Sequence, residues 1–259
     1  MRKIFVAFMM LMMLLFVTGC GTSKTEKLVV GIDDDFPPIS FRDTQGELIG
    51  FDIELAREAA KRLGVEFEFR PIDWDNKREE LTSGNVDMIW DGLDITDERK
   101  EYMLFSKPYM DDRQILLVKA GDTQGIGVEE DLEGKIVGTQ AGSTSECYLS
   151  GKETLRNSFK GYKTYAKFTE TVDALKRGDI DVVVCDEIVA RYEMNTNPDQ
   201  LEIVNVKIGD LTETGIGFRK DSVALRDRVQ KVFDEMIRDG TAKKISEQWF
   251  QADLIKQVR

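Results

Sequence analysis

The sequence predicts an α/β protein made of two lobes of similar plan, each with a mostly parallel sheet. Two observations support this prediction. Strand-like and helix-like segments alternate along the chain, which is typical of parallel sheets. In addition, "ELTSGNVDMIWDG" and "ALKRGDIDVVVCDE" share one order: a helix end, a glycine, a polar residue, and an apolar strand followed by an acid. This repeat indicates two units that fold alike.

Local patterns in the first half predict its main elements. "KLVVGI" and "VEFEFRPI" are typical of strands. Pro37 and Pro38 exclude a helix from "DDDFPPISF", because proline lacks an N–H donor and restricts its neighbours. "FDIELAREAAKRLG" has apolar residues at helical spacing and ends in Gly64, which predicts a helix. "DNKREELTSGN" predicts a shorter helix stopped at Gly84, and "VDMIW" predicts a buried strand.

The second half repeats this rhythm. "KIVGTQ" predicts a strand, and "STSE" predicts a capping box with Ser143 as the cap and Glu146 at its third position. "FTETVDALKRGD" predicts a helix ending at Gly178, followed by the buried strand "IDVVVCD". The last apolar pattern predicts two helices separated by Gly240, with Thr241 as the expected cap of the second.

Composition excludes several classes of function. The chain of 259 residues carries a net charge of −12, which argues against a nucleic-acid partner because phosphate binding needs a basic surface. Histidine is absent, and the three cysteines form no CxxC pair, so a zinc ribbon is not expected. We therefore expect no metal and no cofactor.

The N-terminus predicts a processed and anchored protein. Residues 1–19 combine a basic start with fourteen apolar residues, which span about 21 Å and are too short for a bilayer core of about 30 Å. This pattern predicts a signal peptide. "VTGC" resembles a lipobox, with Cys20 as the lipidated residue and residues 20–26 as a tether. We expect an extracytoplasmic protein that is lipid-anchored to the cell membrane.

Seven motifs resemble, in order, those of one known family: "GIDDDFPPISF", "GELIGFDIELA", "SGNVDMIWDGLDITDERK", "FSKPY", "GKIVGTQAGSTSE", "VVVCDEI" and "DGTAKKISEQWF". The chain, from Leu28 to Phe250, is similar to extracytoplasmic solute-binding proteins of family 3, the polar amino acid receptors of ABC importers. Each motif is weak alone, but their order is specific. The resemblance implies a monomer that binds an amino acid and docks on a membrane permease.

The resemblance also implies a domain organisation. The fold is the two-lobed, periplasmic-binding-protein-like (type II) fold, with mixed, mostly parallel sheets and a two-strand hinge. Crossovers near 109–113 and 208–213 make the first lobe discontinuous. Lobe 1 is then residues 27–110 plus 211–259, and lobe 2 is residues 111–210. Ligand is expected in the cleft, beyond the carboxyl ends of the strands.

A free amino acid presents a carboxylate and an ammonium, and both charges need partners when buried. The resemblance implies that Arg99 binds the carboxylate, with Ser143 and Thr144 contributing from lobe 2. Arg99 also has a structural alternative, as a surface residue paired with a neighbouring acid. For the ammonium, the resemblance implies Asp186 and the backbone carbonyl of Gly92.

Other positions are implied to surround the ligand side chain. Phe36 and Phe51 match aromatic walls, although core packing is an alternative for both. Asp33 matches a contact to a polar tail. Two residues depart from the family pattern. Asp91 stands where a small or amide residue is common, and Asp94 stands where Ser or Thr is common.

The acids Asp33, Asp91, Asp94 and Asp186 face Arg99 alone in this prediction, which leaves an acidic cleft. This balance favours a cationic ligand such as lysine, arginine or ornithine, with glutamine or cystine as the alternative. A dehydratase on the same fold, with Asp94 or Asp91 as general acid, is the competing enzyme hypothesis, and a sensor without a permease is the third. Cys147 and Cys185 are expected near the cleft, either as a disulfide or as two free thiols.

Overall fold

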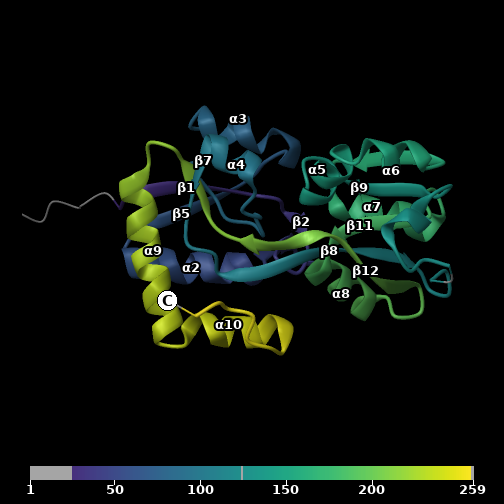
Figure 1. The fold of residues 1–259 in the computed structure, drawn as a ribbon. Coiled ribbons are helices and arrows are strands. Elements are labelled where there is room, and N and C mark those ends of the chain that lie inside the picture. Colours follow the sequence, from purple (N-terminus) through teal and green to yellow (C-terminus); the bar gives the residue numbers. More distant parts are fainter. Residues whose placement is uncertain (1–24, 124, 258–259) are drawn as a thin grey trace, which may run out of the picture.

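The computed structural model describes residues 25–123 and 125–257. Figure 1 shows two lobes, each with a central sheet and flanking helices, joined by long strands. Within these ranges no helix combines the length and the apolar character needed to cross a membrane. The expected signal peptide and the lipidation site Cys20 lie outside the described residues.

The sheet of the first lobe has the strand order β5-β1-β6-β13-β7. β1 pairs in parallel with β5 and β6, whereas β13 runs antiparallel to β6 and β7. The sheet is therefore mixed, and its parallel part consists of β5, β1 and β6. The bounds are β1 (Lys27–Ile32), β5 (Glu66–Pro71), β6 (Met88–Ile89), β7 (Met103–Phe105) and β13 (Gly217–Arg219).

Helices and a small three-stranded sheet complete the first lobe. The predicted helix after Gly50 is confirmed, and it ends where Gly64 takes the left-handed conformation at φ 69°. Thr241 is not the cap of the last helix, because Gly240 takes that position and the Thr241 hydroxyl accepts from Arg62 instead. The elements are β2 (Asp35–Phe36), β3 (Ser40–Arg42), β4 (Leu48–Ile49), α2 (Phe51–Leu63), η1 (Trp74–Asn76), α3 (Lys77–Thr82), α4 (Asp97–Tyr102), α9 (Val223–Arg238) and α10 (Thr241–Phe250).

The sheet of the second lobe has the strand order β10-β9-β11-β8-β12. β10, β9 and β11 are parallel, and β8 runs antiparallel to both β11 and β12. The elements are β8 (Met110–Lys119), η2 (Glu129–Leu132), β9 (Ile136–Gln140), α5 (Thr144–Ser150), α6 (Glu153–Ser158), β10 (Gly161–Tyr165), α7 (Phe168–Arg177), β11 (Val182–Asp186), α8 (Glu187–Thr196) and β12 (Leu201–Thr214).

The two lobes are connected by β8 and β12, which pair with each other in antiparallel fashion (Figure 1). Asp112 lies opposite Thr212 in this ribbon, and Met110 lies opposite Thr214. At the first-lobe end, Asp94 forms an isolated bridge with Thr214. The predicted two-strand connection is therefore present, and it carries Asp112 into the space between the lobes.

The sequence repeat corresponds to a repeated structural detail. Asp87 accepts from the N–H of Val29 at 2.7 Å, and Asp181 accepts from the N–H of Ile136 at 2.7 Å. In each lobe an aspartate at the start of a central strand thus ties that strand to its parallel neighbour. The first of these strands is shorter than "VDMIW" predicts, since β6 ends at Ile89. Trp90, next along the chain, is fully buried against Phe233 and belongs to the core.

Candidate functional site

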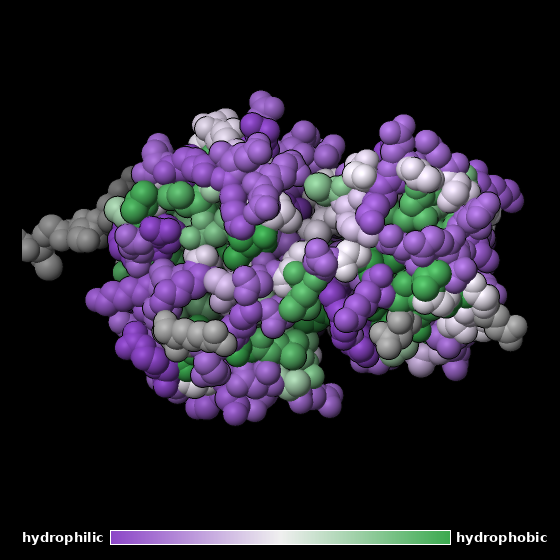
Figure 2. All heavy atoms as spheres, in the orientation of Figure 1, coloured by the Kyte–Doolittle hydropathy of each residue, from purple (hydrophilic) through white to green (hydrophobic). Residues whose placement is uncertain are grey.

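A small, partly open cavity lies between the two lobes. Its walls come from the carboxyl ends of β1, β6, β9 and β11 and from the first turns of nearby helices. Figure 2 shows hydrophilic residues over much of the visible face of both lobes, with hydrophilic, intermediate and hydrophobic residues side by side in the region between them. The lining residues are Asp33, Phe36, Trp74, Asp91, Gly92, Arg99, Gln140, Ser143, Thr144 and Asp186.

Arg99 points into this cavity from α4. Its backbone N–H is capped by Thr96 at 3.2 Å, which fixes the start of the helix. The guanidinium is 5% exposed and donates to the carbonyl of Asp94 at 3.0 Å and, across the cleft, to that of Gly142 at 3.3 Å. The surface alternative is wrong for this residue. The arrangement places a planar cation at the cavity wall, where it suits a carboxylate.

Ser143 and Thr144 begin α5 on the opposite wall. Ser143 is the N-cap and accepts from the N–H of Glu146 at 3.1 Å, as predicted. The returning bond differs from an ordinary capping box, because Glu146 accepts from Gly142 at 2.6 Å. The two hydroxyl residues are thereby held at the cavity surface.

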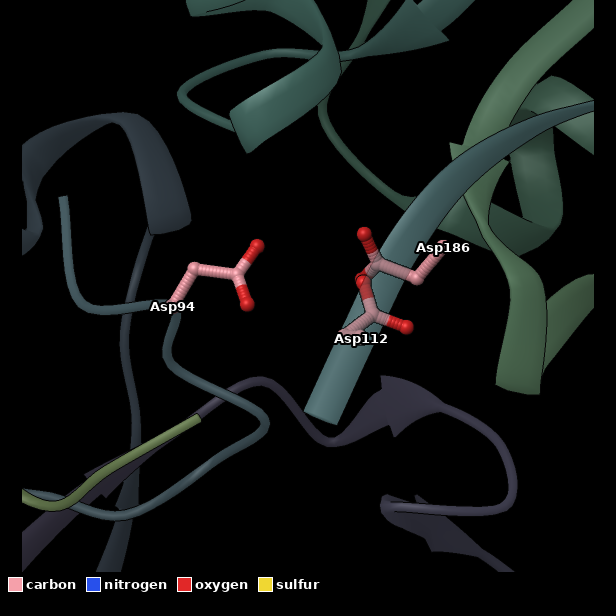
Figure 3. A group of neighbouring side chains, drawn as sticks. All are labelled: Asp94, Asp112 and Asp186. Atoms are coloured by element: carbon pink, nitrogen blue, oxygen red, sulfur yellow. The ribbon is translucent and has the colours of Figure 1, made fainter. Parts of the chain in front are cut away.

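Three carboxyl groups meet beside the cavity. Oxygens of Asp94, Asp112 and Asp186 all lie within 4.8 Å of one another. Figure 3 shows Asp94 directed from the first lobe toward Asp112 and Asp186. The Gln114 side-chain amide donates to both Asp112, at 3.2 Å, and Asp186. Asp112 was missed from the sequence, where its only signal is its place on the expected crossover.

Burial and mutual repulsion raise the pKa values of these acids. Burial, and next the charge of Asp94, raise the pKa of Asp186 to about 7. Burial and the charge of Asp186 hold the pKa of Asp112 well above its usual range. Burial also raises the pKa of Asp94, although Arg99 opposes this. Among the described residues Asp94 Oδ1 is buried with no hydrogen-bond partner, so a cationic donor would stabilise the cluster.

An ammonium group is one such donor, but the same spacing also suits a metal ion. Carboxylate oxygens are the ligands that Ca²⁺ and Mg²⁺ prefer. The expectation of no metal therefore stays a prediction. Asp94, expected among the ligand contacts, is not among the residues that line the cavity, although its carboxyl group lies beside that of the lining residue Asp186.

Asp91 lines the cavity, yet its carboxylate serves the fold. One oxygen accepts from the N–H of Asp33 at 2.6 Å, and the other accepts from the Ser40 hydroxyl. The residue is completely buried, and burial followed by the charge of Asp33 holds its pKa well above the usual range. The Asp91 carboxylate therefore has a structural role, and the predicted contact of this residue with ligand stays a prediction.

Gly92 lines the cavity, and the contact that the sequence predicts for its carbonyl stays a prediction. Its N–H donates to Asp52 at 2.6 Å, which leaves the carbonyl as the polar group it can offer to a ligand. Its φ of 56° is left-handed, and a Cβ atom here would lie 3.2 Å from the Phe36 ring. A glycine is therefore required for the tight approach to Phe36.

The aromatic walls are Phe36 and Trp74. Phe51 is fully buried at the start of α2, with its ring centroid 4.8 Å from that of Phe250. Phe51 is not among the cavity-lining residues and packs in the core, which supports the alternative of core packing for this residue. Trp74 was missed, although it follows the carboxyl end of β5, where the sequence predicts ligand contacts.

Two lysines change the charge balance that the sequence predicts. Lys167 binds Asp33 at 2.7 Å. Lys77 is buried and donates to the carbonyls of Gly142, at 2.6 Å, and Trp74, at 3.0 Å. Burial and the charge of Arg99 lower the pKa of Lys77 to about 7. Arg99 is therefore not the lone cation of the cleft, and the acid count no longer supports a cationic ligand by itself.

Both described cysteines are free thiols. Cys185 is buried in β11, whereas Cys147 is exposed on α5 and its thiol donates to Glu98 at 3.4 Å across the cleft. The disulfide alternative is therefore wrong, and the alternative of two free thiols holds.

The chain matches the family model of bacterial extracellular solute-binding proteins, family 3, over residues 28–252. It belongs to this family. This family 3 protein is 34% identical to the L-cystine-binding protein TcyJ of Escherichia coli (strain K12), over 88% of this chain and 84% of the relative. The predicted family is thus confirmed.

Solved structures confirm the predicted type II fold of this family 3 protein. An ancestral arginine-binding protein bound to arginine has a TM-score of 0.81 and 40% identity, and the match covers 86% of this chain and 98% of that one. A substrate-binding protein of an ABC uptake transporter from Streptococcus pneumoniae, with bound histidine, has a TM-score of 0.83 and 32% identity, over 89% and 95% of the chains.

Proposed function

We propose that this protein is the substrate-binding receptor of an ABC importer and captures an L-amino acid between its lobes. The observation that carries the proposal is the cavity itself, which is lined by the buried guanidinium of Arg99 and by the carboxyl group of Asp186. These groups match the two charges of a zwitterion. Relatives whose names state a ligand include proteins that bind cystine, arginine, histidine, or lysine, arginine and ornithine, and one solved relative has glutamine bound.

Capture takes place by closure of the two lobes. Arg99 and the Phe36 and Trp74 rings hold the ligand on the first lobe, and Ser143 and Asp186 join it from the second. One ligand then bridges the lobes, so the closed form is stabilised in proportion to the contacts made only when the cleft is shut. The ribbon of β8 and β12 supplies the hinge.

The cellular setting of this proposal follows the sequence. Lobe 1 is assigned residues 27–110 plus 211–259, and lobe 2 is assigned residues 111–210. Cys20 carries the lipid after removal of residues 1–19, and the closed monomer docks on a membrane permease. Labelling of cells with a radioactive fatty acid tests the anchor: the chain takes up label, and a Cys20→Ala variant does not.

The protein acts by binding and not by turnover in this proposal. The Asp94–Asp112–Asp186 cluster contains acids with raised pKa values, which are the groups an enzyme on this fold would use. Incubation with prephenate or arogenate separates the two functions. Consumption of either compound over time would show that the protein is a dehydratase and would contradict the receptor function.

A thermal-shift panel of L-amino acids, ornithine and cystine tests the receptor directly. A ligand at about 100 times its dissociation constant adds about 2.7 kcal/mol to stability, which is several degrees for a chain of this size. We expect at least one amino acid to raise the melting temperature, and an Arg99→Ala variant to lose that shift. A flat response to the whole panel would contradict the proposal.

A further inference from the structure

We propose that Lys167 is a specificity-determining residue, which occupies the acidic acceptor Asp33 and restricts the cavity to amino acids with an uncharged side-chain tip. This inference rests on the proposed function and deepens it, because it names the class of ligand. It concerns the part of the cavity wall that Asp33 and Gln140 form. These residues are other than Arg99 and Asp186, which match the two charges of the zwitterion.

Both carboxylate oxygens of Asp33 already accept hydrogen bonds from the protein. Oδ1 accepts from the Lys167 ammonium at 2.7 Å and from the N–H of Asp35 at 3.1 Å. Oδ2 accepts from the Gln140 side-chain amide at 2.6 Å. The residue is 1% exposed. A charge that is this deeply buried is held by its partners, and here the protein supplies both a counter-ion and hydrogen-bond donors.

Lys167 comes from the other lobe. It directly precedes α7, and its ammonium also lies 3.5 Å from Asp34. Burial disfavours the ammonium, but the hydrogen bond and charge of Asp33 outweigh burial and raise the pKa of Lys167. The group is therefore charged at neutral pH. The contact therefore links the two lobes and supplies the counter-ion of Asp33.

A lysine, arginine or ornithine side chain would meet two obstacles at this wall. The carboxylate of Asp33 is already paired, and the Lys167 charge would repel a second cation. The N–H groups of the Gln140 side-chain amide already donate to Asp33, at 2.6 Å, and to the Ala166 carbonyl, at 3.3 Å. An uncharged amide or hydroxyl tip leaves these bonds and the ion pair in place, and it can donate to the Gln140 carbonyl oxygen. The ion pair thus acts against cationic ligands by repulsion and desolvation, which are common means of specificity.

The test compares Lys167→Met with the parent protein by titration calorimetry, using L-glutamine, L-serine, L-lysine and L-arginine as probes. Methionine keeps a flexible stem of similar length and removes the charge. We expect the parent to favour an uncharged probe, and the variant to gain about tenfold or more for lysine or arginine, since Asp33 is then unpaired. Affinity for the uncharged probe should change by less than about threefold.

Two further variants keep the test decisive. Lys163→Met is the matched control, because Lys163 is an exposed lysine of the same lobe that donates to the backbone of Asp179; its specificity should equal the parent's. If Lys167→Met is too unstable to measure, the double variant Asp33→Asn with Lys167→Met removes both charges, and it should bind uncharged probes without gaining cationic ones.

Three outcomes would overturn the inference. A parent that binds lysine or arginine most tightly, with affinity unchanged or weakened in Lys167→Met, shows that the pair does not exclude cations. A gain for cationic probes in the double variant shows that Asp33 is not the acceptor. Failure of the parent to bind any amino acid removes the proposed function itself, and is distinct from binding with the opposite preference.

Discussion

The ammonium of Lys77 donates to the carbonyl oxygen of Gly142 at 2.6 Å, from the first lobe to the second. The Arg99 guanidinium donates to the same oxygen at 3.3 Å. Two cations of one lobe therefore converge on a single backbone acceptor of the other. This acceptor immediately precedes the Ser143 cap of α5, so closure of the lobes and the shape of the ligand cavity are coupled at one peptide group.

Removal of the first cation should weaken ligand capture. A Lys77→Met variant loses a charged hydrogen bond, worth about 1.5–3 kcal/mol, but it also avoids the burial of a charge. We expect a net loss of about 1 kcal/mol, or about fivefold in Kd, measured by titration calorimetry. Lys100→Met is the control, because Lys100 is an exposed helix lysine paired with Asp97. Tighter binding by Lys77→Met would mean that its burial cost dominates.

A methyl group at Gly142 should hold the lobes apart. Its φ is 69°, and a Cβ atom would lie 2.8 Å from Asp75 Cα and 2.9 Å from the Trp74 carbonyl oxygen. Gly142→Ala should therefore bind ligand at least about 100-fold more weakly, because closure is blocked and not because a ligand contact is lost. Small-angle scattering should show no decrease in radius of gyration on addition of ligand.

Gly121→Ala is the matched control for backbone strain. Its φ is 90°, so alanine is strained there too, but a Cβ atom would meet no atom within 4 Å. This variant should lose stability and keep ligand-induced compaction. If Gly121→Ala and Gly142→Ala behave alike, strain and not steric blockage explains the result.

Replacement of Arg99 by lysine should abolish most of the affinity while the fold persists. Lysine keeps the charge, but it cannot form the planar pair with a carboxylate. Loss of such a buried contact costs about 2–5 kcal/mol, so we expect a fall of about 30-fold or more in affinity by calorimetry. Arg57→Lys is the control, since Arg57 donates to the Leu48 carbonyl on the outer side of α2. An Arg99→Lys variant with parental affinity would remove Arg99 from the carboxylate site.

The carboxyl cluster predicts a specific pH dependence of the ligand-free protein. The pKa of Asp186 is about 7, raised by burial and by Asp94, so the folded state holds a proton there that the unfolded state releases near pH 4. The unfolded state binds fewer protons in this window, and the contribution of Asp186 to stability therefore falls as pH rises from about 4 to about 7. Lys77, with a pKa of about 7, acts in the opposite direction only above that window.

An Asp186→Asn variant isolates this contribution. We expect it to be more stable than the parent at pH 7.5 by about 1–3 kcal/mol, after allowance for the weakened bond with Gln114. The difference should shrink toward pH 4, where the parent carboxyl group is neutral. Thermal unfolding at both pH values measures it. A difference that is independent of pH would show that Asp186 stays ionised throughout.

Local sequence patterns were sufficient for the elements and for part of the site. The helix at 51–63 has an apolar face and a glycine stop, and "GSTSE" contains its own cap, so each of these segments specifies its conformation through residues three or four positions apart. The repeated aspartates Asp87 and Asp181 precede equivalent strands in the two lobes, and the sequence repeat contains both. The lining residues Arg99, Ser143 and Asp186 lie at the ends of such segments, where a motif keeps its spacing.

The sequence by itself therefore determined the α/β plan, the family and the strand ends that surround the cavity. Only the tertiary structure decided which side chains reach it. Asp112 enters the cleft because β8 crosses between lobes, and Lys167 meets Asp33 across 134 residues of chain. Phe51 packs against Phe250 in the core, whereas Trp74 lines the cavity between the lobes. Charge pairing and burial depend on neighbours that are distant in sequence, so no local pattern can reveal them.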